Sequence, residues 1–580
     1  MSQYLFNSVP TIHRKRNVFD LSHRLFTSLN VGELAPVYLQ EVYPGDDFKV
    51  DSAFISRVTS SLLRPVMDNV YLDQMFFFVP SRLLYDKFKN VMGESEGAWA
   101  PSKTYKVPEI YDACVKASES QAFIASGTVG DYLGLPSETI FGQSRTQEDF
   151  PVISLLPFRA FALIYNDWFR DENVEQPMLV QRGEAVASER PNQNDWSPSN
   201  YVGKLPKVNK LHDYFTSALP SPQKGENVAL PLSGTAPIVP VPGSASSRLD
   251  TLVDTGVGSV RTQGRRQLSS YRSVNGADDF DIQEAGDDGN FGSVQFKGYS
   301  TLTGSALNGL LEADLSDSTA ANINDLRTAT QLQRMLERDA RGGTRYIEYI
   351  RSAFGVDSGD YRLQRPEFLG GRRTPLQVQQ VPQTVGAGKV VDGESLGSLG
   401  AYSLSFGTSG MRKGFLEHGY IIGVACLRQK HTYQQGINKM WSRVERTDFY
   451  DSVFQNLGEQ PIYETEIYNG GFSSGAPKKT DIFGYQEAWA DLRQCQNRVS
   501  GSMRSSSGSG LDIWHYASNY GAPPVLNSAF LRETENNVNR SLAVPHTDKS
   551  NPQFILEFDF KVRATRVLPK YSVPGLLDHN

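Results

Sequence analysis

The sequence has few of the residues that usually carry disulfide bonding or metal binding. Its 580 residues include only three cysteines, Cys114, Cys426 and Cys495, and these lie far apart in the chain. Disulfide frameworks and structural zinc sites need more cysteines at short, regular spacings. We therefore expect neither feature, and we expect the chain to fold in a reducing compartment.

Catalytic motifs are also scarce. The eight histidines form no close pair, since the two nearest, His13 and His23, are ten residues apart. The segment GFSSG at 471–475 has the spacing of a serine nucleophile motif, but no buried strand and helix are expected to flank it. The segment GTSGMRKG at 407–414 has the wrong spacing for a phosphate-binding loop. We predict no enzyme, no cofactor and no transition-metal site, and a calcium site of scattered carboxylates stays open.

Long apolar runs and a strong net charge are absent as well. No window approaches the roughly 18 apolar residues of a membrane-spanning helix. The N-terminal segment MSQYLFNSVPTIHRKRNVFD has no sustained apolar core, unlike a signal peptide. The formal net charge of −6 excludes a uniformly basic nucleic-acid-binding protein, although a locally basic face remains possible. We expect no membrane insertion.

Alternating apolar and polar residues predict β-strands near both ends of the chain. In the clearest run, at 553–567, Phe554, Leu556, Phe558 and Phe560 alternate with other residues, several of them charged. Similar runs occupy 46–58, 69–85 and 418–428. Strands so distant in sequence must meet to bury their apolar faces, which indicates a Greek-key or jelly-roll pair of sheets with long insertions. Helices predicted at 156–173, 323–343 and 344–355 would cover this β core.

Residues 226–320 differ in composition from the rest of the chain. They hold 12 acidic against 6 basic residues, and only 5 aromatic residues with no tryptophan. Such a segment has little material for a core of its own, so it is either a flexible insertion or a loop-rich outward projection. The well-formed elements predicted on both sides favour an ordered insertion, a usual place for variable recognition.

The stretch RQKHTYQQGINKMWSRVERTDFY at 428–450 interleaves cations with aromatic residues. Two explanations fit this composition. Aromatic rings stack on nucleic-acid bases while cations neutralise phosphates, and Trp, Tyr and Arg are also enriched at protein interfaces. Of the two we favour the protein interface, and the residues that we single out for it are Tyr433, Trp441, Arg443, Phe449 and Tyr450.

A short basic arm lies near the N-terminus. The segment HRKR at 13–16 includes Arg14, Lys15 and Arg16, which are candidates for contact with DNA phosphates. The alternative is that these side chains are simply solvated.

Several blocks of the sequence together resemble one protein family. They lie at 19–48 (FDLSHRLFTSLNVGELAPVYLQEVYPGDDF), 155–173 (LLPFRAFALIYNDWFRDEN), 212–225 (HDYFTSALPSPQKG), 337–356 (ERDARGGTRYIEYIRSAFGV), 362–371 (RLQRPEFLGG), 431–461 (HTYQQGINKMWSR to LGEQP) and 482–493 (IFGYQEAWADLR). In this order they are similar to the major capsid proteins of gokushoviruses, small single-stranded DNA phages of the Microviridae. The diverged residues 226–320 fall where these proteins carry their most variable insertion.

The resemblance implies a mainly β fold, a single eight-stranded antiparallel jelly roll with long inserted loops and several helices. It implies self-assembly into a T=1 icosahedral shell around a circular single-stranded DNA genome. It further implies that 226–320 protrudes around the threefold axes and attaches to the host. With this resemblance, we interpret 428–450 mainly as a contact between shell subunits.

The same resemblance gives the expected organisation and partners. Residues 1–45 would form a partly extended interior arm, 46–225 the first part of the jelly roll, and 321–580 its remainder. The expected partners are other copies of the chain, genomic DNA, small internal DNA-binding and scaffolding proteins, a minor pilot protein and a host surface receptor. The protein would lie in the virion after assembly in the bacterial cytoplasm. A β-rich carbohydrate-binding or adhesin module is the alternative that composition alone leaves open.

Overall fold

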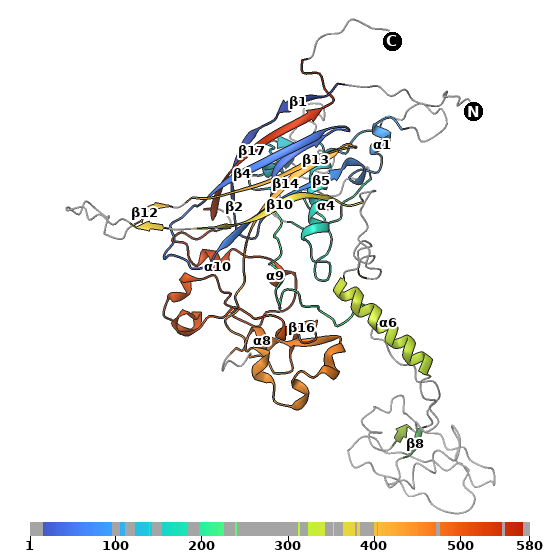
Figure 1. Ribbon diagram of the computed structural model, residues 1–580, viewed down its shortest axis with the longest axis vertical. Helices are drawn as coiled ribbons and strands as arrows, with labels where there is room; N and C mark the ends of the chain where they lie inside the picture. The colour runs from blue at the N-terminus through green and yellow to red at the C-terminus, as the bar shows by residue number, and fades with distance from the viewer. Residues whose placement is uncertain are drawn as a thin grey trace, which may run out of the picture. The chain divides into compact units, whose positions relative to one another are not determined.

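The computed structural model describes residues 15–94, 105–110, 122–137, 140–141, 153–183, 196–225, 238–240, 311–313, 323–342, 352, 364–377, 380–382, 399–402, 404–470, 476–547 and 551–571 (Figure 1). Contacts between residues divide the chain into two units. One unit combines Met1–Lys224 with Glu337–Asn580, and the other is Gly225–Leu336.

The larger unit contains two antiparallel sheets, which we name sheet A and sheet B. Sheet A has the order β1–β17–β4–β13, and β2 continues the edge begun by β1 along β17. Its strands are β1 (Asn17–Asp20), β2 (His23–Leu29), β4 (Asp47–Val58), β13 (Ser405–Gly414) and β17 (Phe554–Arg566). Sheet B has the order β10–β5–β14–β3. Its strands are β3 (Leu34–Val42), β5 (Val70–Pro80), β10 (Glu367–Leu376) and β14 (Gly419–Gln429).

The two sheets are built from four nested strand pairs. β5 pairs with β10, β4 with β13, β3 with β14 and β2 with β17, all antiparallel. Each pair encloses the previous one in the chain, so the strands follow the path of one long hairpin. Pairing of β17 with β4 and of β14 with β5 joins the nested pairs into two sheets. Figure 1 shows β17 and β4 side by side, at opposite ends of the colour scale.

The core lies between the inner faces of the two sheets. The ring of Tyr38 on β3 is 5.1 Å from that of Phe560 on β17 and 5.9 Å from that of Phe76 on β5. In β17 the residues Phe554 to Ala564 are buried at every second position, as the alternating sequence predicts. The remaining positions of this strand form the outer face of sheet A.

Strands β5 and β14 are buried on both faces. Helix α4 (Leu156–Ile164) contacts both strands, and Phe77 of β5 packs against Trp168 and Phe169 at 5.4 and 6.1 Å between ring centroids. These two aromatic residues lie in the π-helical turn η3 (Tyr165–Phe169) that continues α4. Cover on both sides explains why β5 contains the continuous run Phe76–Phe77–Phe78–Val79 and not an alternating pattern.

A second hydrophobic cluster follows β14 in the same unit. Phe483 packs edge-to-face against Phe215 and Phe530, with ring centroids 6.1 and 5.1 Å apart. The elements around it are β15 (Glu459–Tyr463), β16 (Ile482–Glu487), α8 (Glu464–Ile467) and α9 (Ser528–Leu531). The following helix, α10 (Asn536–Asn539), instead contributes Val538 to the main core.

The remaining elements, of which α6 is the longest, complete the described structure. They are α1 (Phe88–Val91), α3 (Val129–Tyr132), α6 (Ile323–Gly342), β6 (Ala122–Phe123), β7 (Ile140–Phe141), β8 (Ile238–Pro240), β9 (Leu311–Ala313), β11 (Gln380–Pro382) and β12 (Leu399–Tyr402), with 3₁₀ turns η1 (Ser81–Leu83), η7 (Ala490–Leu492), η8 (Gly501–Met503), η9 (Ser505–Ser507) and η10 (Leu511–Trp514). Among the described residues no helix is both long and apolar enough to cross a membrane.

The strands predicted at 46–58, 69–85, 418–428 and 553–567 are confirmed as β4, β5, β14 and β17. The helix predicted at 323–343 is α6, and the helix predicted at 156–173 is shorter, because α4 gives way to η3. The helix predicted at 344–355 lies outside the described residues apart from Ser352.

The extent of the expected N-terminal arm needs correction. Residues 17–42 include β1, β2 and the whole of β3, so this part of 1–45 belongs to the two sheets. Edge pairing with β17 satisfies the backbone groups of β1 and β2. Of the insertion 226–320, only β8 and β9 are described, and these two short strands pair with each other.

The nested fold predicts that the inner face of β17 is sensitive to truncation. In Phe558→Ala, a buried ring that packs against Phe54 and Phe560 is lost, so the free energy of unfolding should fall by about 3–5 kcal/mol. Ile555→Ala, on the half-exposed outer face of the same strand, is the matched control and should lose less than about 1 kcal/mol. Urea unfolding followed by tryptophan fluorescence measures both, and equal losses would contradict this account of the core.

Candidate assembly surface

The loop after β14 carries an unusual number of exposed apolar side chains. We name residues 437–457 the ridge. Trp441 is 74% exposed and Val444 is 83% exposed. The other exposed apolar residues of the ridge are Ile437, Met440, Phe449, Tyr450, Val453 and Leu457. Single exposed apolar residues are normal, but a concentrated group of them is typical of a surface that binds another protein.

Buried polar contacts fix the direction in which the chain leaves β14. His431 Nε2 lies 2.9 Å from Glu533 Oε2, and both side chains are fully buried. Gln429 Nε2 donates to the other oxygen of Glu533 at 3.2 Å. Because an unpaired buried carboxylate would be strongly unfavourable, these contacts tie the end of β14 to the segment after α9.

Tyr433 lies near the start of the loop that follows β14. Its ring packs edge-to-face on Phe215 at 4.7 Å, and its hydroxyl donates to Asp213 Oδ2 at 2.7 Å. Burial, together with the nearby Asp213 carboxylate, raises the pKa of Tyr433 well above its ordinary value. Within this chain Tyr433 therefore connects the loop to the second hydrophobic cluster.

Side-chain caps hold the ridge in a series of short turns. Asn438 Oδ1 accepts a hydrogen bond from the Met440 amide at 3.0 Å. Asp448 Oδ2 accepts from the amides of Val444 and Glu445 at 2.9 and 2.8 Å, and these bonds lower the pKa of Asp448. The turns are η4 (Lys439–Ser442), η5 (Arg446–Asp448) and η6 (Ser452–Asn456). The polar atoms of the caps thus face the backbone, while the apolar side chains face outward.

Two further contacts anchor the ridge to the rest of the unit. Arg443 forms an ion pair with Asp491 and donates through Nε to the Asp448 carbonyl at 3.1 Å. Tyr450 packs edge-to-face on Trp489 at 5.4 Å, and Trp489 Nε1 donates to the Phe454 carbonyl at 3.0 Å. The ridge is therefore fixed before any partner binds, which lowers the entropy lost on association.

A groove runs beside the ridge. It has a volume of about 1230 Å³ and is bounded by 433–443 on one side and 491–504 on the other. Trp441 and Leu492 supply apolar surface, and Arg498 and Arg504 supply positive charge. The exposed Cys495 also lies on its wall.

The structure places the sequence candidates in two groups. Trp441, Phe449 and Tyr450 are exposed on the ridge, whereas Tyr433 and Arg443 make contacts within the chain. Sequence reasoning missed Val444, Val453 and Leu457, because isolated aliphatic residues among polar ones give no pattern. The sequence did contain a signal for the turns of the ridge, because Asn438, Asp448 and Asp451 are of the residue types that favour turn caps.

The basic arm is only partly described. Arg14 lies outside the described residues. Lys15 and Arg16 are exposed and lead directly into β1 at the edge of sheet A. Their proposed contact with DNA stays a prediction.

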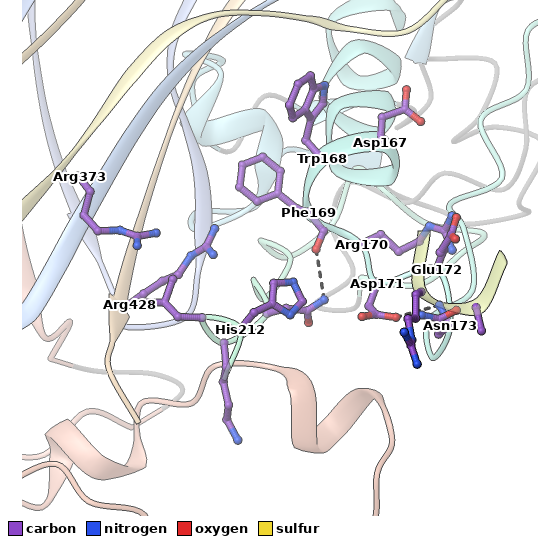
Figure 2. A pocket seen from close by; sticks show the side chains of 15 residues that line it. Asp167, Trp168, Phe169, Arg170, Asp171, Glu172, Asn173, His212, Arg373 and Arg428 are labelled. Carbon is purple, nitrogen blue, oxygen red and sulfur yellow. Dashed lines mark hydrogen bonds between the residues drawn. The ribbon is translucent and has the colours of Figure 1, made fainter. Parts of the chain in front are cut away.

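A separate pocket of about 540 Å³ lies beside η3 (Figure 2). Arg373 and Arg428 enter it from sheet B, and Asp167 to Asn173 enter it from η3 and the following loop. Arg373 forms a bidentate ion pair with Asp73 at 2.6 and 2.8 Å, and Arg428 lies 3.5 Å from the same carboxylate. Arg428, the first residue of the stretch 428–450, therefore helps to join β14 to β5. In the described part of the chain no group of three or more His, Cys, Asp or Glu residues is arranged to hold a metal ion.

A rigid two-sheet subunit with an exposed apolar ridge is typical of a protein that assembles with other subunits. The family model for the capsid protein (F protein) matches residues 7–576. The chain is 36% identical to capsid protein VP1 of Chlamydia phage 1, over 98% of this chain and 97% of that one. It is also 36% identical to capsid protein VP1 of Bdellovibrio phage phiMH2K, over 99% and 98%, and to that of Spiroplasma virus 4, over 97% and 96%. The chain therefore belongs to the capsid protein (F protein) family and is a structural capsid protein.

A buried carboxylate below the ridge predicts a pH dependence of stability. Glu466 accepts hydrogen bonds from the Tyr214 hydroxyl and the Tyr463 amide, both at 3.1 Å, and burial raises its pKa above the ordinary value of 4.5. Between 4.5 and the raised pKa the folded chain holds a proton that the unfolded chain has lost. The free energy of unfolding therefore falls as the pH rises through this window.

Glu466→Gln removes this titration. We expect the difference in unfolding midpoint between the variant and the wild type to grow as the pH rises above 4.5 and then to level off. Thermal unfolding at a series of pH values measures this difference. Glu94→Gln, at an exposed carboxylate, is the control. A Glu466→Gln curve that matches the control curve at every pH would contradict the assignment.

Proposed function

We propose that the chain is the major subunit of a T=1 icosahedral shell that encloses a circular single-stranded DNA genome. Membership of the capsid protein family over nearly the whole chain is the observation that supports this most strongly. The subunit would act by assembly and binding, without catalysis. It would lie in the virion after assembly in the cytoplasm of a host bacterium.

The strand order supports a jelly roll as the shell-forming domain. A jelly roll arises when one long antiparallel hairpin is rolled so that its two halves become two packed sheets. The nested pairs β5–β10, β4–β13, β3–β14 and β2–β17 have this order. With β1 and β2 taken as one interrupted strand, the two sheets contain the eight strands that such a domain needs.

The ridge would form contacts between neighbouring subunits. A closed shell needs specific surfaces that fit other copies of the same chain. Trp441, Phe449 and Tyr450 offer large apolar area at low entropic cost, because the caps and the Arg443–Asp491 ion pair already fix their backbone. The groove beside the ridge, with Arg498 and Arg504, is a receptor for an apolar and acidic segment of a neighbouring copy.

The insertion 226–320 would form a surface protrusion near the threefold axes that binds a host receptor. Its acidic composition and its separation as part of the unit Gly225–Leu336 support this function. Within the insertion, Ile238 pairs with Ala313 and Pro240 with Leu311, so the described positions on either side of 241–310 lie next to each other. Further proposed partners are small internal DNA-binding and scaffolding proteins and a minor pilot protein.

Trp441→Ala tests the assembly surface. Trp441 is highly exposed, so its removal should leave the subunit folded but should lower particle yield strongly, since a central Trp contact is commonly worth about 2 kcal/mol or more. Tyr571→Ala removes an equally exposed aromatic side chain outside the ridge and is the matched control. Sedimentation and electron microscopy measure particle yield. Wild-type yield from Trp441→Ala would exclude this residue from the interface.

Replacement of 241–310 by a short glycine-containing turn tests the insertion. Pro240 and Leu311 are paired, so a turn between them should close the β8–β9 ladder without strain on the larger unit. We expect assembly to be preserved and adsorption to host cells to be abolished. Particle counts and adsorption assays measure the two effects separately, and normal adsorption by intact particles would refute attachment through this segment.

A further inference from the structure

On the outer face of sheet A, a row across four strands carries exposed apolar side chains on three of them. The register pairs Phe26 of β2 with Glu557 of β17, Glu557 with Ile55 of β4, and Ile55 with Phe406 of β13. Phe26 is 71% exposed and Phe406 is 79% exposed. With three strand spacings between them, the two phenyl groups lie about 14 Å apart on the same face.

A basic row crosses the same face further along the strands. Arg563 of β17 pairs with Lys49 of β4, and Lys49 pairs with Arg412 of β13. All three side chains are exposed. Six residues of β17 separate this row from the apolar row, which is a distance of about 20 Å.

A hollow of about 620 Å³ lies on this face between the two rows. Its lining combines the small residues Ala53, Thr408 and Gly410 with two carboxylates and two cations, which are those of Asp51, Asp559, Lys561 and, from β10 at the edge of sheet B, Arg372. This volume is within the range of pockets that hold small organic groups. The face therefore combines flat aromatic surface, a shallow depression and cations.

The carboxylates on this face are largely balanced by their neighbours. Asp51 lies 3.2 Å from Lys49, and Arg24 lies 3.7 Å from Glu557 and 3.8 Å from Asp559. Asp20 of β1 pairs in register with Arg563, and Asp47 of β4 also lies on this face. Within the described part of the chain, no ion pair joins Arg57, Arg412 or Lys561 to a carboxylate, whereas Lys49 and Arg24 are paired. The outer positions of the five strands hold six basic residues (Arg24, Lys49, Arg57, Arg412, Lys561 and Arg563) and five acidic ones (Asp20, Asp47, Asp51, Glu557 and Asp559), which is a small positive excess in a chain that is acidic as a whole.

We propose that the outer face of sheet A binds single-stranded nucleic acid. Bases stack on Phe26 and Phe406, while Arg412, Lys561 and Arg563 neutralise phosphates. Sheet faces with exposed aromatic residues bind single strands in this way, since every unpaired base has a flat surface. A duplex keeps its bases stacked and could use only the cations, so the face favours single strands.

The exposed arm residues extend the same surface. Lys15 and Arg16 lead into β1, where Asn17 pairs with Arg566 at the basic end of β17. Lys15 and Arg16 thus precede the strand that pairs with the basic end of β17. This inference rests on the proposed function and deepens it, because it assigns genome contact to a defined sheet face.

Phenyl removal tests the stacking part of the proposal. Fluorescence anisotropy of a labelled oligothymidylate with the purified full-length chain measures affinity. Phe26→Ala and Phe406→Ala should each weaken binding on the order of tenfold, and Phe406→Tyr should restore it. Leu416→Ala, at a side chain that is 91% exposed outside this face, is the control and should change nothing. Unchanged affinity in both alanine variants would overturn the proposal.

Charge removal tests the phosphate contacts independently. Arg412→Gln and Lys561→Gln should each lower the slope of log affinity against log salt by about one. An unchanged slope in both variants would overturn the phosphate assignment.

Ultraviolet crosslinking in intact particles separates this proposal from the proposed function. Crosslinked peptides that include Phe26 or Phe406 support the face, and crosslinks confined to other segments exclude it. If the crosslinks lie elsewhere, the particles still support the proposed shell function, and only the nucleic-acid face is excluded. If the wild-type chain forms no particles, the shell function is contradicted, and the oligothymidylate measurements still test the face.

Discussion

The pairing of β17 with β2 and β4 is the constraint on which the rest of the structure depends. It places β17 between β2 and β4 and so completes sheet A. Without β17, the inner residues Phe48, Val50 and Phe54 of β4 would lose the strand beside them.

Long-range pairing of this kind has a large loop-closure cost, which the burial of Phe554 to Ala564 must offset. Long insertions between strands change that cost only slowly, because it grows with the logarithm of loop length. The fold can therefore carry the segment 226–320 without loss of its two sheets.

The ridge depends on the same framework through buried polar contacts. Glu533 holds His431 and Gln429 at the end of β14, and Tyr433 reaches Asp213 in the second hydrophobic cluster. These contacts fix where the loop begins, and the caps at Asn438 and Asp448 fix its path. Apolar residues can then remain exposed in the free subunit without collapse onto the core. The free subunit therefore exposes an apolar surface that can bind another protein, which is consistent with a chain whose stable state is an assembly.

Local pattern was enough to predict the strands but not the surfaces they form. The alternation of Phe554, Leu556, Phe558 and Phe560 predicted β17 to within one residue at each end, because a half-buried strand has a strict period of two. Trp441, Phe449 and Tyr450 could be selected from composition, since large aromatic residues among polar ones seldom lack a packing or binding role. Tyr433 has the same composition signal but lies against Phe215, and only the three-dimensional structure separates the two cases. The row of Phe26, Ile55 and Phe406 was not predictable, because it requires the register of strands from three distant segments.

The two exposed surfaces differ in the physical force that they offer to a partner. On the ridge the carboxylates of Asp448 and Asp451 are occupied by backbone amides, and Arg443 is paired with Asp491. In the proposed interface, association would rest mainly on apolar burial, which salt does not screen, while Arg498 and Arg504 of the groove would add a smaller salt-sensitive attraction. On sheet A the unpaired cations Arg412 and Lys561 make association depend on counterion release, which salt opposes steeply. A rise in ionic strength would thus weaken nucleic-acid binding while subunit contacts persist. Under the two proposals, shell closure and genome contact would respond differently to ionic strength, although one chain carries both surfaces.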